Sequence, residues 1–433
     1  MTFRISHPEV DVEGQQPPAR RHPRPPAPLP GGVRRPSLRS TAAGVFSLVA
    51  IAATGLASGP AAGEPSAGPC ALPRTDAHHS LGLDTWNAAY PKPDRALDAV
   101  MLFLSFPDSV PPHSTETIAA DYFPDTNEFF ERASYGRFTL RAHPRHGWLR
   151  MPRPSTAYAI RRDWAADRRA AYLRDALRVA DPVVDFSRYD IVYLVADPEA
   201  PGVDSDATKV VNLRTPLRAD GTDIDRVVTL FERHPPDRNV LAHETGHVFD
   251  LPDLYNRPVD GKGDWDTHVG DWDVMGSQFA LAPEPFGWHK WKLGWLGAHQ
   301  VRCVREPQLV TLQPLAAENG APAAPGPRLA VVRTGPDRVL AFEVREASGN
   351  DRGTCTEGVL VYRVRGGTES GAGPVEVVDA HPLTEACRDR SVYPPLADAP
   401  LMEGESLTVA EEGVRVEVLH RTAAGGWTVR ITP

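Results

Sequence analysis

The chain has few of the features that mark several protein classes. Its 433 residues include only four cysteines, so disulfide bonds cannot take the place of a hydrophobic core, as they do in small secreted scaffolds. Its 35 glycines and 44 prolines follow no fixed period, which argues against a repeat protein. What remains is a globular protein, long enough to form two domains.

Net positive charge is also missing. The formal net charge is −9 at pH 7. The residues before Ala62 carry seven arginines and three acidic residues, so the rest of the chain carries −13. Nucleic acids and anionic lipid surfaces attract proteins through excess basic charge. We therefore expect no nucleic-acid partner and no binding to anionic lipid through bulk charge.

The N-terminal region predicts an export signal. A basic stretch, GGVRRPSLRS (31–40), precedes the apolar run TAAGVFSLVAIAATGLA (41–57), and small residues that allow cleavage follow it. An uncleaved membrane anchor is the alternative, but it needs about 20 strongly apolar residues. We predict that residues 1–63 form a signal region. The protein would then be secreted, hence extracellular, with no stable membrane insertion after signal cleavage.

The four cysteines are an even set, which in an exported chain predicts two disulfides. Four cysteines allow three pairings, of which we favour Cys355 with Cys387 and Cys70 with Cys303. The alternative is that Cys70 is a free thiolate that caps a metal ion in a latent form. That alternative would leave one of the other three cysteines without a partner.

Apolar runs and helical periodicity predict an α/β region. Short runs rich in β-branched and aromatic residues indicate buried strands at residues 99–106 and 189–196. Helices are predicted between them at residues 125–136 and 163–181, the second with an apolar stripe along one face. A further strand at residues 225–232 comes just before the stretch that carries the candidate site.

After about residue 298 the pattern changes to short strands separated by glycine and proline clusters, which predicts an all-β module. The expected strands contain the stretches LVTL, RVLAFEVRE, GVLVYRVRG, GVRVEVL and GWTVRIT. Residues 317–328 are expected to form an exposed loop inside this module, because strands resume on both sides of it.

The stretch HETGHVFDLPDLYN (243–256) has the spacing of a metal site. His243 and His247 are four residues apart, so on a helix both imidazoles lie on one face. Asp237 is the expected N-cap of this helix. The helix must end before Pro252, whose ring disfavours helical backbone at the preceding residue.

Asp250 marks the expected end of this helix. Aspartate tolerates the left-handed conformation better than most residues, so it can turn the chain back over the helix. That turn points Asp253 at the two histidines and leaves a fourth position for water, as in catalytic zinc sites. Glu244 is next to the ligands without being one, and is the expected general base.

The bare His-Glu-x-x-His pattern is only moderately specific. In a chain with 15 histidines it should arise by chance on the order of once in forty sequences. The alternative is an ordinary helix whose histidines form hydrogen bonds in the core. The carboxylate at the tenth residue after His243 favours the metal site. So does GDWDVMGS (270–277), whose Met275 is expected to form a tight turn under the metal.

A second cluster of carboxylates follows the helix. Asp260, Asp264 and Asp266, with Asp271 and Asp273 further on, form a candidate calcium site, because calcium prefers several oxygen ligands. A solvated acidic loop is the alternative.

With these residues the chain resembles the secreted metallopeptidases similar to immune inhibitor A, which are zincins with Asp as the third zinc ligand. The likeness runs from about Asp98 to the C-terminus. Beyond the two motifs above, it includes FFERASYGRFTLR (129–141), DFSRYDIVYLVA (185–196), WHKWKLGWL (288–296) and GVLVYRVR (358–365). The family usually has glycine where this chain has Asp250, so a glycine there should be tolerated.

The resemblance implies an α/β zincin-like catalytic domain at residues 96–299, with a mixed sheet and an active-site helix. A C-terminal all-β module would follow at residues 300–433, and residues 64–95 would be a short N-terminal segment. The implied activity is zinc-dependent hydrolysis of protein or peptide substrates. The implied site residues are the zinc ligands His243, His247 and Asp253, the general base Glu244 and Met275 in the Met-turn. The alternative is a catalytically silent relative that acts as an extracellular binding protein.

Overall fold

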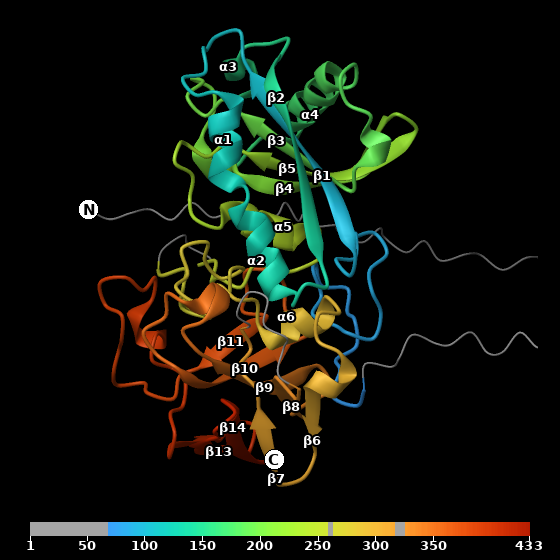
Figure 1. Cartoon of the computed structure of the whole chain (residues 1–433). Helices are drawn as coiled ribbons and strands as arrows, with labels where there is room; N and C mark the ends of the chain where they lie inside the picture. Colours follow the sequence, from blue (N-terminus) through green and yellow to red (C-terminus); the bar gives the residue numbers. More distant parts are fainter. Residues whose placement is uncertain (1–67, 259–262, 317–324) are drawn as a thin grey trace, which may run out of the picture. The chain divides into compact units, whose positions relative to one another are not determined.

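The computed structural model describes residues 68–258, 263–316 and 325–433 (Figure 1). The predicted signal region and Asp260 lie outside these residues, as does most of the loop predicted at residues 317–328. Within the described residues, no helix has both the length and the apolar character needed to cross a membrane.

The first sheet has five strands in the order β2-β1-β3-β5-β4 (Figure 1). Its first four strands run parallel, whereas β4 pairs antiparallel with β5. The strands are β1 (Ala96–Ser105), β2 (Thr139–Arg150), β3 (Ile191–Ala196), β4 (Lys209–Ala219) and β5 (Thr222–Leu230). The three strands expected from their apolar runs are confirmed as β1, β3 and β5.

The sequence gives no sign of β2 and β4, and both lie at the edges of this sheet. Along most of their length they are exposed or half-buried. In β2, the apolar residues are separated by charged and polar ones and form no long run. Edge strands cover less of the core than central strands, so they lack the continuous apolar run that marks a buried strand.

Helices cover both faces of this sheet. The helices are α1 (Thr115–Tyr122), α2 (Asp125–Ala133), α3 (Ser155–Tyr158) and α4 (Ala166–Ala180), with 3-10 turns η1 (Phe186–Arg188) and η2 (Ser205–Ala207). Side chains of β1 alternate between the faces. Met101 and Phe103 share a core with α2, whereas Val100 and Leu102 share another with α4. The two predicted helices are thus confirmed as α2 and α4.

The region after residue 298 is mostly β, as expected, and contains two sheets with the orders β11-β10-β9-β8-β6 and β12-β13-β14-β7 (Figure 1). The strands of the first are β6 (Val301–Val304), β8 (Leu329–Arg333), β9 (Arg338–Arg345), β10 (Gly358–Arg365) and β11 (Val375–Val378). Those of the second are β7 (Gln308–Leu312), β12 (Ser406–Val409), β13 (Val414–Arg421) and β14 (Trp427–Thr432). Three 3-10 turns accompany them, η3 (Ala298–Gln300), η4 (Gly349–Asp351) and η5 (Pro394–Leu396).

Two short helices lie between the first sheet and these two sheets in the chain, α5 (Val240–Val248) and α6 (Gly287–Lys292). One buried core joins the parts before and after residue 300, since it includes Met101 of β1, Phe249 after α5, Trp288 of α6 and Tyr362 of β10. The described residues belong to one compact unit. The candidate site therefore lies in a continuous core.

A buried arginine also links the two parts. Arg345 at the end of β9 is fully buried, and its guanidinium pairs with Glu343 at 2.8 Å and Asp351 at 2.7 Å. It also donates to the backbone carbonyls of Ala282 at 2.8 Å and Glu284 at 3.0 Å. The second sheet is thus hydrogen-bonded to the segment that leads into α6.

Both predicted disulfides are confirmed. Cys70 is bonded to Cys303 and Cys355 to Cys387, with Cα atoms 5.6 and 6.0 Å apart. The idea that Cys70 is a free thiolate over a metal is therefore wrong, because its sulfur is already bonded. The two disulfides are compatible with an extracellular protein.

Candidate metal centre

The helix that carries the motif is short and fully buried. All nine residues of α5 are buried, and the helix contacts α2, β4 and β5. The predicted N-cap, Asp237, is wrong. The helix begins after Asn239, whose left-handed backbone (φ 62°) cannot belong to a right-handed helix. The Asp237 carboxylate instead accepts a hydrogen bond from Gln278 at 2.7 Å.

The helix ends where the sequence analysis predicted. The helix ends at Val248, and Asp250 is left-handed with φ 62°. The amide of Leu251 donates to the carbonyl of Gly246 at 3.1 Å, which closes the last turn and reverses the chain. The reversal brings the segment with Asp253 back over the helix.

Three buried side chains meet at this reversal. The Nε2 atoms of His243 and His247 lie 3.4 and 3.0 Å from Oδ1 of Asp253. One ligand atom from each side chain lies within 4.8 Å of the other two, and each residue is at most 1% exposed. This group could hold a metal ion.

Backbone carbonyls fix both histidine rings. Nδ1 of His243 donates to the carbonyl of Val274, and Nδ1 of His247 donates to that of Leu251, both at 2.8 Å. A carbonyl only accepts, so in the neutral rings the proton lies on Nδ1 and the Nε2 lone pairs face Asp253. In this tautomer, Nε2 of each ring is free to bind a metal ion.

The atoms that face one another lack hydrogen-bond donors. Both Nε2 atoms and Oδ1 of Asp253 are buried without a hydrogen-bond partner. Burial opposes ionisation of Asp253, but the positive charge that the two imidazoles carry when they are protonated outweighs it and holds the pKa of Asp253 well below the usual range. Its other oxygen, Oδ2, accepts from Ser370 at 3.1 Å. Converging acceptor atoms in a dry site are costly unless a cation lies between them, so the three residues fit a divalent metal.

Glu244 is a second unpaired carboxyl beside the ligands. It is fully buried, and neither of its oxygens has a hydrogen-bond partner. Burial raises its pKa to about 8, with His243 opposing the shift and Asp253 adding to it. A carboxyl with a pKa close to neutrality and no structural partner is suited to proton transfer.

Met275 packs under the helix. Its amide donates to Oδ1 of Asp273 at 2.7 Å, which tightens the turn that contains it. A Cβ placed on Gly246 would lie 2.3 Å from the Met275 sulfur. The methionine therefore contacts the helix between the two histidines, where only glycine leaves room for it.

Asp273 is a structural residue, a role that the sequence did not reveal. Its Oδ2 accepts from the amide of Phe286 at 2.7 Å and from Nδ1 of His289 at 3.0 Å. Both residues adjoin or belong to α6. Asp273 thus links the Met275 turn to that helix, and both of its oxygens are engaged by the protein itself.

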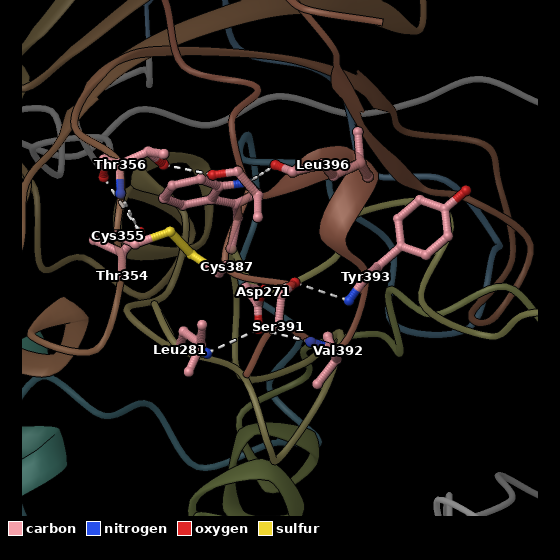
Figure 2. Close-up of a disulfide and its surroundings, with 12 residues drawn as sticks. Asp271, Leu281, Thr354, Cys355, Thr356, Cys387, Ser391, Val392, Tyr393 and Leu396 are labelled. Carbon is pink, nitrogen blue, oxygen red and sulfur yellow. Dashed lines mark hydrogen bonds between the residues drawn. A yellow bond between two sulfur atoms is a disulfide. The ribbon is translucent and has the colours of Figure 1, made fainter. Parts of the chain in front are cut away.

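Asp271 is also engaged by the protein, beside the Cys355–Cys387 disulfide. Figure 2 shows its carboxylate between Leu281, whose amide donates to it at 3.0 Å, and Ser391, whose hydroxyl also donates to it. Sequence reasoning grouped Asp271 with the calcium carboxylates. The structure shows that it connects the segment just after Cys387 to the segment after Met275.

The remaining calcium candidates are incomplete. Asp264 is exposed and accepts from the amide of Asp266, whose own side chain is buried with one unpaired oxygen. Within residues 68–258, 263–316 and 325–433, only the His243 group has the geometry of a metal site with three such ligands. Asp260 lies outside these residues, so the calcium site stays a prediction.

Sequence reasoning missed the residues that surround Asp250. Its carboxylate, predicted only to turn the chain, contacts Arg74 at 2.8 Å, His79 at 3.0 Å and Lys292 at 3.2 Å. Burial lowers the pKa of His79 to about 3, so its ring is neutral and its Nδ1 donates to the carboxylate. No local spacing connects positions so far apart in the chain, so no sequence signal could have found them.

No protein-family model matches the chain, and no curated protein is significantly similar to it in sequence. Its function has to be inferred from the geometry of the site.

Proposed function

We propose that the protein is a secreted zinc-dependent endopeptidase with a zincin-like catalytic domain, as the resemblance to the immune inhibitor A group implies. The observation that carries the proposal is the convergence of His243, His247 and Asp253 beside an unpaired Glu244. Two neutral imidazoles and one carboxylate are the ligand set of catalytic zinc sites that keep one position open. Bound there, zinc would supply Lewis acidity and lower the pKa of a water molecule to about 7.

The protein residues supply the remaining chemistry. Glu244 takes a proton from the attacking water and passes it to the amine that leaves when the peptide bond breaks. Its burial suits this role, because neither of its oxygens is engaged by another protein group and both are free to exchange a proton with the attacking water. The hydrogen bonds to Val274, Leu251 and Ser370 hold the three ligand side chains in place.

The first sheet supports a peptide as the substrate. Strand β4 is the antiparallel edge of that sheet and contacts α5. An edge strand presents unpaired backbone groups to which an extended peptide can add. A mixed sheet whose antiparallel edge adjoins the metal helix is also what supports the zincin-like assignment.

Export is part of the proposal. The two disulfides agree with an oxidising compartment. The acidic chain offers no bulk positive charge for nucleic acid, so proteins or peptides are the proposed partners. The second candidate function is a silent relative that binds a partner through its β sheets. The complete set of three ligands and Glu244 favours the enzyme, because a chain without catalysis has no need of the base.

The test is a Glu244→Gln variant of the secreted protein, with Glu232→Gln as the matched control. Glu232 is also largely buried, and burial, together with Asp237, raises its pKa to about 8; its charge adds to the raised pKa of Glu244 less than burial and Asp253 do. We expect Glu244→Gln to keep one zinc per chain and to cleave casein about two to four powers of ten more slowly. The control should retain activity.

A Glu244→Gln protein that cleaves casein at the wild-type rate would exclude this mechanism. Wild-type protein that holds zinc but cleaves no protein substrate would favour the binding protein instead.

A further inference from the structure

We propose that residues 70–93, here called the N-terminal strap, are a permanent part of the metal centre. Arg74 and His79 in this strap are positioning residues for the ligand Asp253, and they act through Asp250. The inference rests on the proposed metal site but not on peptidase activity. It also means that the strap is not a prosegment that must be removed.

Asp250 is held at two points. Its carboxylate is buried between Arg74 and His79 of the strap and Lys292 of α6. Its backbone carbonyl accepts a further hydrogen bond from the Lys292 ammonium. Because Asp250 is the left-handed residue that reverses the chain, fixing its side chain and carbonyl fixes the direction in which the next three residues run. The last of these is Asp253.

His79 also touches a ligand directly. Its ring is stacked on that of His247, with centroids 5.6 Å apart and planes inclined by 23°. Both side chains are buried, so the strap ring limits how far the ligand ring can rotate. His79 thus contacts both the ligand His247 and Asp250, the turn residue that leads to the ligand Asp253.

The strap is anchored along its whole length. The Cys70–Cys303 disulfide ties its start to β6, and Leu72 and Leu81 lie in the main core. Near its end, the indole of Trp295 donates to the carbonyl of Pro93 at 2.7 Å. Removing the strap would expose this core and take away two of the three side chains that neutralise or hydrogen-bond Asp250.

Because residue 250 is aspartate and not glycine, the turn depends on side chains of the strap. Glycine would adopt the same left-handed backbone without any partner. A buried carboxylate needs its partners, because an uncompensated charge in the core is costly. Asp250 therefore couples the geometry of the metal site to a segment that begins about 180 residues earlier in the chain.

The test compares zinc affinity among strap variants of the full secreted protein. Arg74→Ala and His79→Ala remove partners of Asp250. Thr75→Ala is the matched control, because Thr75 donates to the Gly366 carbonyl at 2.7 Å and does not contact Asp250. Zinc affinity is measured by competition with a chromophoric chelator, and ligand geometry by the absorption spectrum of the cobalt-substituted protein.

We expect Arg74→Ala and His79→Ala to weaken zinc binding about 10- to 100-fold and to change the cobalt spectrum. Thr75→Ala should do neither. If the alanine variants do not fold, Arg74→Lys and His79→Asn replace them, with the same changes expected at smaller size. In an Asp250→Gly background, Arg74→Ala should no longer change the zinc affinity, because the residue through which it acts is gone.

Folded variants with the wild-type affinity and cobalt spectrum would overturn the inference. So would a mature protein that lacks residues 70–93 and still binds zinc with unchanged affinity. Wild-type protein that binds zinc without hydrolysing peptides would refute the proposed enzyme and leave this inference standing. Wild-type protein that binds no divalent metal would overturn both.

Discussion

Gly246 and Met275 offer a sharp test of how the helix is supported. An alanine Cβ at position 246 would lie 2.3 Å from the Met275 sulfur, closer than any real contact. Met275 is fully buried and its amide is held by Asp273, so its side chain has little room to withdraw. We therefore expect the effect of Gly246→Ala to depend on what occupies position 275.

Two opposing contributions set the size of the effect. Alanine is favoured over glycine in the interior of a helix by about 1 kcal/mol. Overpacking a buried site costs about 1–3 kcal/mol. In the wild-type background, Gly246→Ala should therefore range from neutral to destabilising by about 2 kcal/mol. With Met275→Ala the clash is gone, and the same substitution should stabilise by up to about 1 kcal/mol.

The assay is equilibrium unfolding in urea with a chelator present, so that metal binding does not contribute to the unfolding free energy. Met101→Ala is the control background, because Met101 is an equally buried methionine that is not among the nearest neighbours of a Cβ at Gly246. Gly246→Ala should keep its wild-type cost there. Equal costs in the Met275→Ala and Met101→Ala backgrounds would show that the sulfur does not support the helix as described.

Three further predictions concern the metal, a disulfide and pH. A chelator should lower the melting temperature of the wild type and zinc should restore it, whereas His243→Ala should respond to neither; an equal response of both proteins would place the metal elsewhere. Replacing Cys355 and Cys387 by serine opens a loop with a sequence separation of 32 and should cost about 3–4 kcal/mol of unfolding free energy, and a loss below about 1 kcal/mol in urea would contradict this. Burial, with Asp264 and Asp271 adding, raises the pKa of Asp266 to about 8. The folded protein then keeps a proton that the unfolded chain loses above about pH 4, so its stability should fall as pH rises from about 4 to 8. Asp266→Asn should remove this part of the slope, and identical slopes in urea titrations of the two proteins would argue against a protonated Asp266.

The parts of the fold that were predicted from sequence are those set by local signals. The strands β1, β3 and β5 are continuous apolar runs because both of their faces are covered. The edge strands β2 and β4 carry no such run and were missed. Strand β13, which is buried on one face only, was predicted from its alternating pattern, so the strands that were missed are those with neither a continuous apolar run nor a clear alternation.

The candidate site divides in the same way. The spacing of His243 and His247 and the left-handed tendency of Asp250 are local, and together they placed Asp253 correctly over the helix. The N-cap was misplaced because Asn239 adopts a left-handed conformation that its neighbours in sequence do not require. Lys292, like the strap residues, meets Asp250 only through the tertiary fold.

The expected effect of Asp250→Gly on stability changes from neutral to destabilising. Glycine at position 250 was expected to be tolerated, because the position only needed a left-handed residue. In the structure, that substitution would leave the fully buried ammonium of Lys292 without its carboxylate. An unpaired buried charge destabilises by about 3–5 kcal/mol, which exceeds any gain from relieving the backbone.

The arginine at the end of β9 also affects whether recombination can separate the parts of the chain before and after residue 300. Arg345 donates hydrogen bonds to the carbonyls of Ala282 and Glu284, and its charge is balanced by Glu343 of β9 and Asp351 of the following turn, η4. Recombination that joined either half to an unrelated partner would leave the two buried carbonyls without their donor. We therefore expect the two halves to pass together through evolution, with gene fusions and losses at the ends of the chain rather than near residue 300.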